Sequence, residues 1–161
     1  MYIDKYWGNY IGGTDDSLNL LEYLKDKQKA ELPLSEVFSD IGLNQLDWNF
    51  HETDVELVYE SRDGFELEFH YAIDVITDLA ALMLECQMNG SVSLGELLDD
   101  EDEDENTVRI IFTDGEKAAM GKALADFAGD PMAYDLCEMV PEEDMLEMAQ
   151  DCENLRRELC G

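Results

Sequence analysis

The sequence has few basic residues for its length. Ten Lys and Arg stand against 40 Asp and Glu in 161 residues, which gives a formal net charge of −30. Such a surface repels nucleic acid and anionic membranes, and it attracts basic proteins at electrostatically steered rates. The composition therefore excludes direct nucleic-acid binding and favours a basic protein as the partner.

Long apolar runs are missing as well. No stretch of about eighteen uncharged apolar residues occurs, which argues against a transmembrane helix. The first residues, MYIDKYWGNY, lack the apolar core of a signal peptide. We expect a cytoplasmic protein that does not interact with a membrane.

Residues typical of catalytic and metal sites are scarce. The two histidines, His51 and His70, stand in no metal-ligand spacing, and G-x-S-x-G, P-loop and G-x-G-x-x-G motifs do not occur. The four cysteines lack a C-x-x-C spacing and are interpreted as small core residues. An EF-hand loop starting at Asp100 would need Gly in place of Glu105 and a carboxylate in place of Ile111. We therefore expect no enzyme, no metal and no cofactor.

What the sequence does contain is a pair of alternating apolar and polar runs within residues 54–71. The apolar positions are all odd-numbered: Val55, Leu57, Tyr59, Phe65, Leu67, Phe69 and Tyr71. This period of two predicts a β-hairpin with one apolar face, and the parity requires a loop with an odd number of residues. Residues 62–64 fit such a loop, with Gly64 at positive φ. The register then opposes Tyr59 with Leu67 and Leu57 with Phe69.

The same register opposes Glu60 with Glu66, and like charges directly across a ladder destabilise a sheet. Two interpretations remain open. Either this outer face is solvated and its charges are screened, or the acidic surface serves to bind a basic partner. His70 falls opposite Glu56, which predicts a cross-strand ion pair.

The helix expected after the hairpin has polar residues only in a narrow stripe. The stripe consists of Asp74, Asp78 and Glu85, so we expect the helix to be buried on most sides and to end at Gly90. Such a helix on the apolar face of a hairpin is the seed of an α+β domain.

Other segments extend this α+β pattern. Thr14 or Asp15 can cap an N-terminal helix, and the strand near 107–112 is expected to join the hairpin in one small antiparallel sheet. Thr113 and Glu116 have the spacing of a capping box, and residues 142–160 predict a final helix with an apolar seam. With 45% apolar residues, we expect residues 1–161 to form a single α+β domain, its sheet packed against several helices.

Most of the charge lies in the later part of the chain. Residues 1–50 hold nine acids and four bases, a net charge of −5, which leaves 31 acids and six bases, a net charge of −25, for residues 51–161. Seven acids are consecutive: Asp99, Asp100, Glu101, Asp102, Glu103, Asp104 and Glu105. Because these side chains repel one another, we expect a solvated acidic loop at about 99–106.

The segment YIDKYWGNYIGGTDDSLNLLEYL and the block FELEFHYAIDVITDLAALMLE resemble immunity proteins of bacterial toxin systems, particularly those of contact-dependent growth inhibition. The resemblance implies an antitoxin that binds a cognate toxin domain one to one and occludes its active or substrate-binding surface. Many such toxins are nucleases, whose basic surfaces hold phosphate. An acidic secretion chaperone that binds an effector segment is the alternative, and a DNA-mimic inhibitor is the third candidate.

The acidic surfaces predict where such a partner binds. We expect the interface to consist of the outer face of the hairpin, with Glu56, Glu60, Glu66 and Glu68, and of the seven acids at 99–105.

Overall fold

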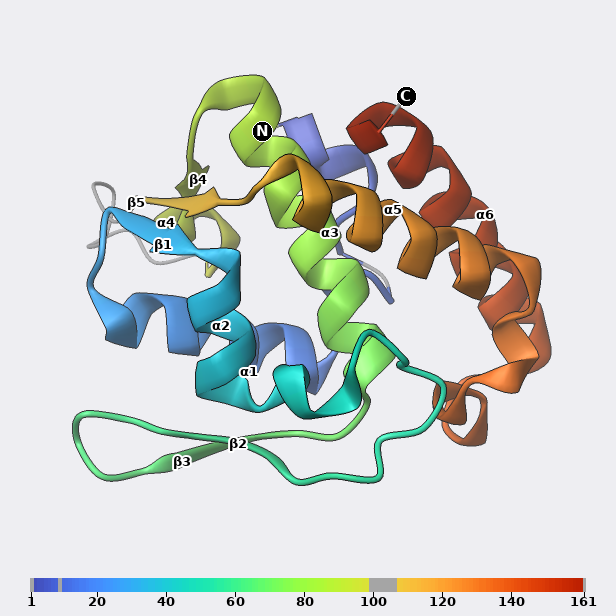
Figure 1. Ribbon diagram of the computed structural model, residues 1–161, viewed down its shortest axis with the longest axis horizontal. Helices are drawn as coiled ribbons and strands as arrows, with labels where there is room; N and C mark the ends of the chain where they lie inside the picture. Colours follow the sequence, from blue (N-terminus) through green and yellow to red (C-terminus); the bar gives the residue numbers. More distant parts are fainter. Residues whose placement is uncertain (1, 9, 99–106, 161) are drawn as a thin grey trace.

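One long helix, α3 (Ala72–Asn89), runs through the middle of the molecule (Figure 1). The computed structural model describes residues 2–8, 10–98 and 107–160. Every residue of α3 from Ala72 to Cys86 is buried, including Asp74, Asp78 and Glu85. The helix ends at Gly90, which has a φ of 90° and donates its N–H to the carbonyl of Cys86. The predicted central helix is confirmed, and its polar stripe is covered as well.

The hairpin forms as the alternation predicts. Strands β2 (Leu57–Glu60) and β3 (Glu66–Phe69) are antiparallel, and Tyr59 pairs with Leu67 and Glu60 with Glu66, so the predicted register is confirmed. Gly64 has a φ of +88° in the connecting loop. The hairpin packs on α1 (Asp15–Lys27), where the Tyr59 hydroxyl donates a hydrogen bond to Asp26 Oδ2 at 2.6 Å.

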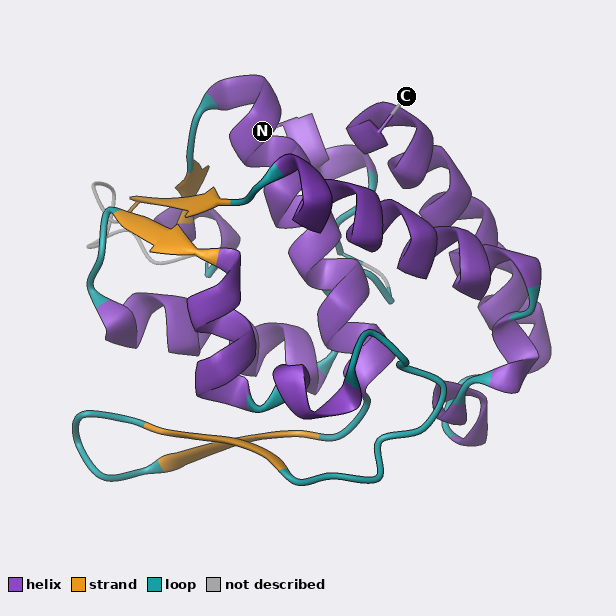
Figure 2. Ribbon diagram, in the orientation of Figure 1, coloured by secondary structure: helices purple, strands orange, loops and turns teal. Residues whose placement is uncertain are grey.

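A second sheet lies apart from the hairpin. Strand β5 (Thr107–Ile111) pairs in parallel with β1 (Glu31–Pro33) and antiparallel with β4 (Val92–Ser93), in the order β1-β5-β4. The α+β class and the strand near 107–112 are confirmed, but the prediction that this strand joins the hairpin was wrong. Its backbone is taken up by β1, a three-residue edge strand that tolerates Pro33 because an edge needs no ladder donor on its outer side. Figures 1 and 2 show α1 and α2 between the two sheets.

The remaining helices enclose α3. Helix α5 (Asp114–Gly129) begins at the predicted capping box of Thr113 and Glu116 and packs along α6 (Glu142–Cys160), whose apolar seam also covers α3. The shorter elements are η1 (Tyr2–Lys5), α2 (Leu34–Ile41), η2 (Leu43–Leu46), α4 (Leu94–Leu97), η4 (Pro131–Ala133) and η5 (Asp135–Glu138). These elements share one hydrophobic core, which α3 crosses.

The cysteines divide into two kinds. Cys86 and Cys152 are buried, as predicted for small core residues, whereas Cys137 is half-buried and Cys160 is exposed. For Cys160, at the C-terminal end of α6, the prediction was wrong, whereas Cys137 still packs against the core.

Candidate partner-binding surface

The outer face of the hairpin gathers four of the predicted glutamates. Glu60 and Glu66 are direct cross-strand partners, Glu68 is opposite Val58, and Glu56 lies just before β2. All four are exposed, while Leu57, Leu67 and Phe69 of the opposite face are buried. The alternation of the strands thus produces one acidic face and one core-facing surface.

The charge on this face is not neutralised within the described residues. Among the described residues, no ion pair involves Glu56, Glu60, Glu66 or Glu68. Acids of α1 and α2, in contrast, do have basic partners. Lys27, for example, bridges Glu36 and Asp40 at 2.8 Å each. A face of this kind is compatible with solvation and with a basic partner, so both interpretations of the opposed pair remain open.

The acidic loop, the second part of the predicted interface, lies outside the described residues. Its seven acids are Asp99, Asp100, Glu101, Asp102, Glu103, Asp104 and Glu105. Of the described residues that flank it, Leu98 follows the last residue of α4 and Thr107 begins β5. These two flanking residues therefore lie beside the three-stranded sheet.

Three buried aspartates hold the N-terminal segment against α3 and β3. The Thr14 hydroxyl donates to Asp74 Oδ2 at 2.7 Å, and Asp78 accepts from Gly12 N–H at 2.8 Å and from the Ser17 hydroxyl at 2.6 Å. Asp16 accepts the backbone N–H of His70 at 2.9 Å and that of Tyr71 at 3.0 Å. Asp74 and Asp78 of the stripe on α3 are therefore hydrogen-bond acceptors for residues 12–17, while Glu85 accepts the backbone N–H of Ile3 at 3.1 Å.

These contacts correct the prediction for His70. Its ring Nδ1 lies 3.2 Å from Asp16 Oδ1, so its carboxylate partner is Asp16 and not Glu56. The described ladder ends at the pair Leu57 and Phe69, and beyond it the chain turns toward the start of α1.

Burial changes the acidity of two of these carboxyls. Burial, with the charge of Asp16 acting in the same direction, raises the pKa of Asp74 to about 7. Burial and the charge of Asp74 also raise the pKa of Asp78 well above its ordinary value. The ionised forms of both carboxyls are thus disfavoured in the folded protein.

A pocket opens where β3 runs into α3. It has a volume of ≈ 240 Å³ and is lined by Thr14, Asp15, Asp16, His70, Tyr71, Asp74 and Met139. Asp74 Oδ1, a buried atom, has no hydrogen-bond partner in the described part of the chain. The pocket therefore combines three carboxylates with the imidazole of His70, the phenol of Tyr71 and the thioether of Met139.

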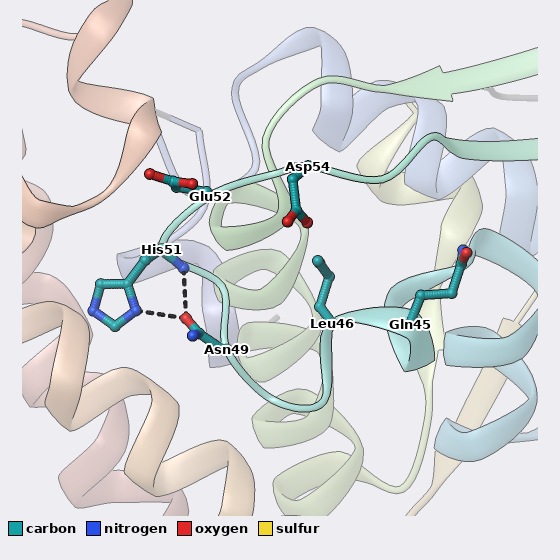
Figure 3. A pocket seen from close by; sticks show the side chains of 6 residues that line it. All are labelled: Gln45, Leu46, Asn49, His51, Glu52 and Asp54. Carbon is teal, nitrogen blue, oxygen red and sulfur yellow. Dashed lines mark hydrogen bonds between the residues drawn. The ribbon is translucent and has the colours of Figure 1, made fainter.

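Further acidic pockets flank residues 51–54. Figure 3 shows the first, of ≈ 270 Å³, where His51 contacts Asn49 Oδ1 through its backbone N–H and through ring Nδ1 at 2.7 Å. His51, Glu52 and Asp54 also line a neighbouring pocket of ≈ 450 Å³, together with Asp135 of η5. Asp135 Oδ2 accepts the N–H of Thr53 at 2.9 Å, while its buried Oδ1 has no partner among the described residues.

Sequence reasoning did not find these pockets. Two of them join segments far apart in the chain, the third lies within residues 45–54, and acids as frequent as these give no local signal. The unpartnered oxygens of Asp74 and Asp135 became visible only in the folded structure.

The carboxylates of the described residues do not gather into a metal-binding cluster. Within residues 2–8, 10–98 and 107–160, no group of three or more His, Cys, Asp or Glu could hold a metal ion. The helices of the same residues are all too short or too polar to cross a membrane.

The fold and its surface define a small acidic α+β protein with unneutralised carboxylates on one hairpin face and in adjacent pockets. The family model Immunity protein 68 matches residues 2–159, so the chain belongs to this family of immunity proteins. Immunity proteins act by neutralising a cognate toxin and are generally not enzymes. Neither the curated proteins nor the solved structures yield a match. The predicted resemblance to bacterial immunity proteins is confirmed and extends across nearly the whole chain.

Proposed function

We propose that this chain neutralises a basic toxin domain, a nuclease, in a one-to-one complex in the cytoplasm. Family membership supports toxin neutralisation, and the observation that carries the finer proposal is the pair Glu60 and Glu66, opposed on an exposed face without an ion pair among the described residues. The repulsion between the two glutamates destabilises the free hairpin. A basic partner would relieve this repulsion, so the same two charges would stabilise the complex.

Nucleases bind phosphate through basic surfaces, which gives the acidic face its target. The glutamates at positions 56, 60, 66 and 68 and the acids at 99–105 engage Lys and Arg of the toxin and cover its substrate-binding or active surface. The net charge of −30 steers the encounter. A toxin delivered by contact-dependent growth inhibition, encoded beside this chain, is the partner that the proposal names.

The test replaces the opposed pair with neutral side chains of the same shape, as Glu60→Gln with Glu66→Gln. We expect the free protein to become slightly more stable, by a few tenths of a kcal/mol, because a like-charge pair across the ladder is removed. We expect the complex with the adjacent toxin domain to become weaker, with slower association, because rim charges chiefly set the association rate.

The matched control is Glu143→Gln with Glu147→Gln, which removes the same charge from an exposed i,i+4 pair on α6. Association should fall more for the hairpin variant than for this control. Equal rates for the two variants would remove the hairpin face from the interface. A complex whose formation does not depend on salt would instead favour the secretion chaperone, and binding to a DNA-binding protein in place of the toxin would favour the DNA mimic.

A further inference from the structure

The pocket where β3 meets α3 has features of a binding site for a cation. It lies between the start of α1, which contributes Thr14, Asp15 and Asp16, and the first turn of α3, which contributes Asp74. We propose that this pocket receives one arginine or lysine side chain of the toxin and anchors the complex there. The inference rests on the proposed function and adds a specific contact to it.

The first observation is an unused hydrogen-bond acceptor. The Asp74 side chain is about as buried as a core leucine, with 1% of its surface exposed. Its Oδ2 accepts the hydroxyl of Thr14, whereas Oδ1 has no partner within the described residues even though Asp74 lines the pocket. A buried carboxylate oxygen without a donor is unfavourable, and a cationic N–H group entering the pocket supplies that donor.

The second observation is the charge around the pocket. Neither Lys nor Arg is among its lining residues, which include three aspartates. The charges of Asp135 and Glu138 also act on Tyr71, which lines the pocket, so the acidic surroundings extend to η5. An incoming cation therefore meets three carboxylates and no Lys or Arg among these residues, and the one basic group there is the His70 imidazole, whose Nδ1 lies 3.2 Å from Asp16 Oδ1.

The walls suit the rest of a long basic side chain. Tyr71 is half-buried and presents an aromatic ring, and Met139 is 54% exposed. Arg and Lys place their apolar stems along such surfaces and their charged heads over aromatic rings. The pocket thus offers an apolar wall for the stem and a carboxylate at depth for the head.

The pocket also continues the proposed interface. His70, which lines it, follows Glu68 by two residues, a distance of roughly 7 Å along an extended strand. A toxin lying on the acidic face of the hairpin can therefore reach the pocket with a neighbouring side chain. Charged groups at the rim and one buried anchor are the usual arrangement of a tight interface.

The first experiment uses Asp74→Asn in the complex with the adjacent toxin domain. Asparagine keeps an oxygen for the Thr14 hydroxyl and removes the charge. We expect dissociation to become faster by roughly tenfold or more, since a partner of a buried charged contact is removed. Asp114→Asn makes the same substitution at an exposed position at the start of α5 and should alter dissociation less than about twofold.

A dissociation rate for Asp74→Asn equal to that of Asp114→Asn would overturn the pocket as the anchor. If in that case Glu60→Gln with Glu66→Gln still slowed association, the proposed function would stand without the pocket. The unfolding midpoint of Asp74→Asn should not fall, which separates a lost contact from a damaged fold.

A second experiment needs no toxin. We expect N-acetyl-argininamide at millimolar concentration to shift the Met139 methyl resonance and the amide resonances of Thr14 and Tyr71, and the neutral citrulline analogue to leave them in place. Asp74→Asn should abolish the shifts. Absence of shifts in the unmodified protein would overturn the pocket, whereas shifts without any toxin binding would retain the cation site and reject the proposed function.

Discussion

Gly12 is the residue at which the N-terminal segment approaches its own aromatic side chain most closely. It has a φ of +81°, and a β-carbon there would lie 2.1 Å from Trp7 Cδ2. We expect Gly12→Ala to lower the free energy of unfolding by roughly 3 kcal/mol or more, because strain at positive φ adds to overpacking against the indole. Urea unfolding of the variant and the unmodified protein measures this difference in free energy.

Gly64→Ala is the matched control for this prediction. Gly64 has a φ of +88°, but nothing lies within 4 Å of a β-carbon added there. That variant should lose only about 1–2 kcal/mol, the strain of the left-handed conformation alone. Equal losses for the two variants would show that the indole moves aside without difficulty.

Asp74 predicts how stability changes with pH. The folded state raises the pKa of this carboxyl to about 7, so its contribution to stability is fully present below the unfolded-state pKa of about 3.9 and is lost as the pH rises through about 7. Asp74→Asn has no proton to lose there. From pH 5 to pH 8 we expect its free energy of unfolding to gain at least about 1.4 kcal/mol relative to the unmodified protein.

The comparison between the two proteins removes titrations that they share. The titration of Asp78 is not shared, because the charge of Asp74 helps to raise the pKa of Asp78 in the unmodified protein. Parallel pH profiles for the two proteins, measured by thermal or urea unfolding, would mean that Asp74 stays ionised in the fold.

At the scale of elements, α3 carries the core. Leu82 lies in its middle with no exposed surface, and α1, α5, α6 and the three-stranded sheet contact this helix. We expect Leu82→Ala to lower the free energy of unfolding by roughly 2–5 kcal/mol, the range for a buried leucine. Leu18→Ala removes the same atoms from a helical leucine that is 51% exposed and should change stability by less than about 0.5 kcal/mol. An unchanged unfolding midpoint for Leu82→Ala would show that packing around α3 does not determine the stability of the fold.

Elements specified by local residues could be predicted from the sequence. The parity of the apolar positions and Gly64 determine the hairpin register, and hydroxyl side chains cap two helices, with Thr14 selected over Asp15 for the first. The four glutamates of the hairpin face were placed correctly for the same reason: neighbouring positions in a strand alternate between two faces.

Contacts between distant segments could not be predicted in this way. Strand β1 has three residues, and its pairing of Leu32 with Ile110 has no local signal. The burial of the acids on α3 could not be predicted either, because nothing in α3 itself indicates that Gly12, Thr14 and Ser17 cover Asp74 and Asp78 with hydrogen-bond donors. The pocket needs α1, β3, α3 and Met139 together, so it exists only once the chain has folded.

The whole molecule is dominated by charge of one sign. A net charge of −30 repels itself in the compact state, and this repulsion weakens as salt shortens the screening length to about 10 Å at 0.1 M. Added salt should therefore stabilise the free protein, while the same screening slows its encounter with a basic toxin. Salt should therefore favour the folded immunity protein but slow its binding to the toxin.

A variant of the acidic loop tests the effects of charge on stability and on association separately. Replacing the seven acids at 99–105 with a Gly/Ser segment of equal length changes the net charge from −30 to −23. Because a run of repelling charges has no core role, we expect the variant to keep its helical circular dichroism and to be at least as stable as the unmodified protein at low salt, with a difference that shrinks as salt rises. Its association with the toxin should be slower and less dependent on salt. Loss of the helical signal would instead give the loop a structural role, and an unchanged association rate would leave recognition to the hairpin face and its neighbouring pocket.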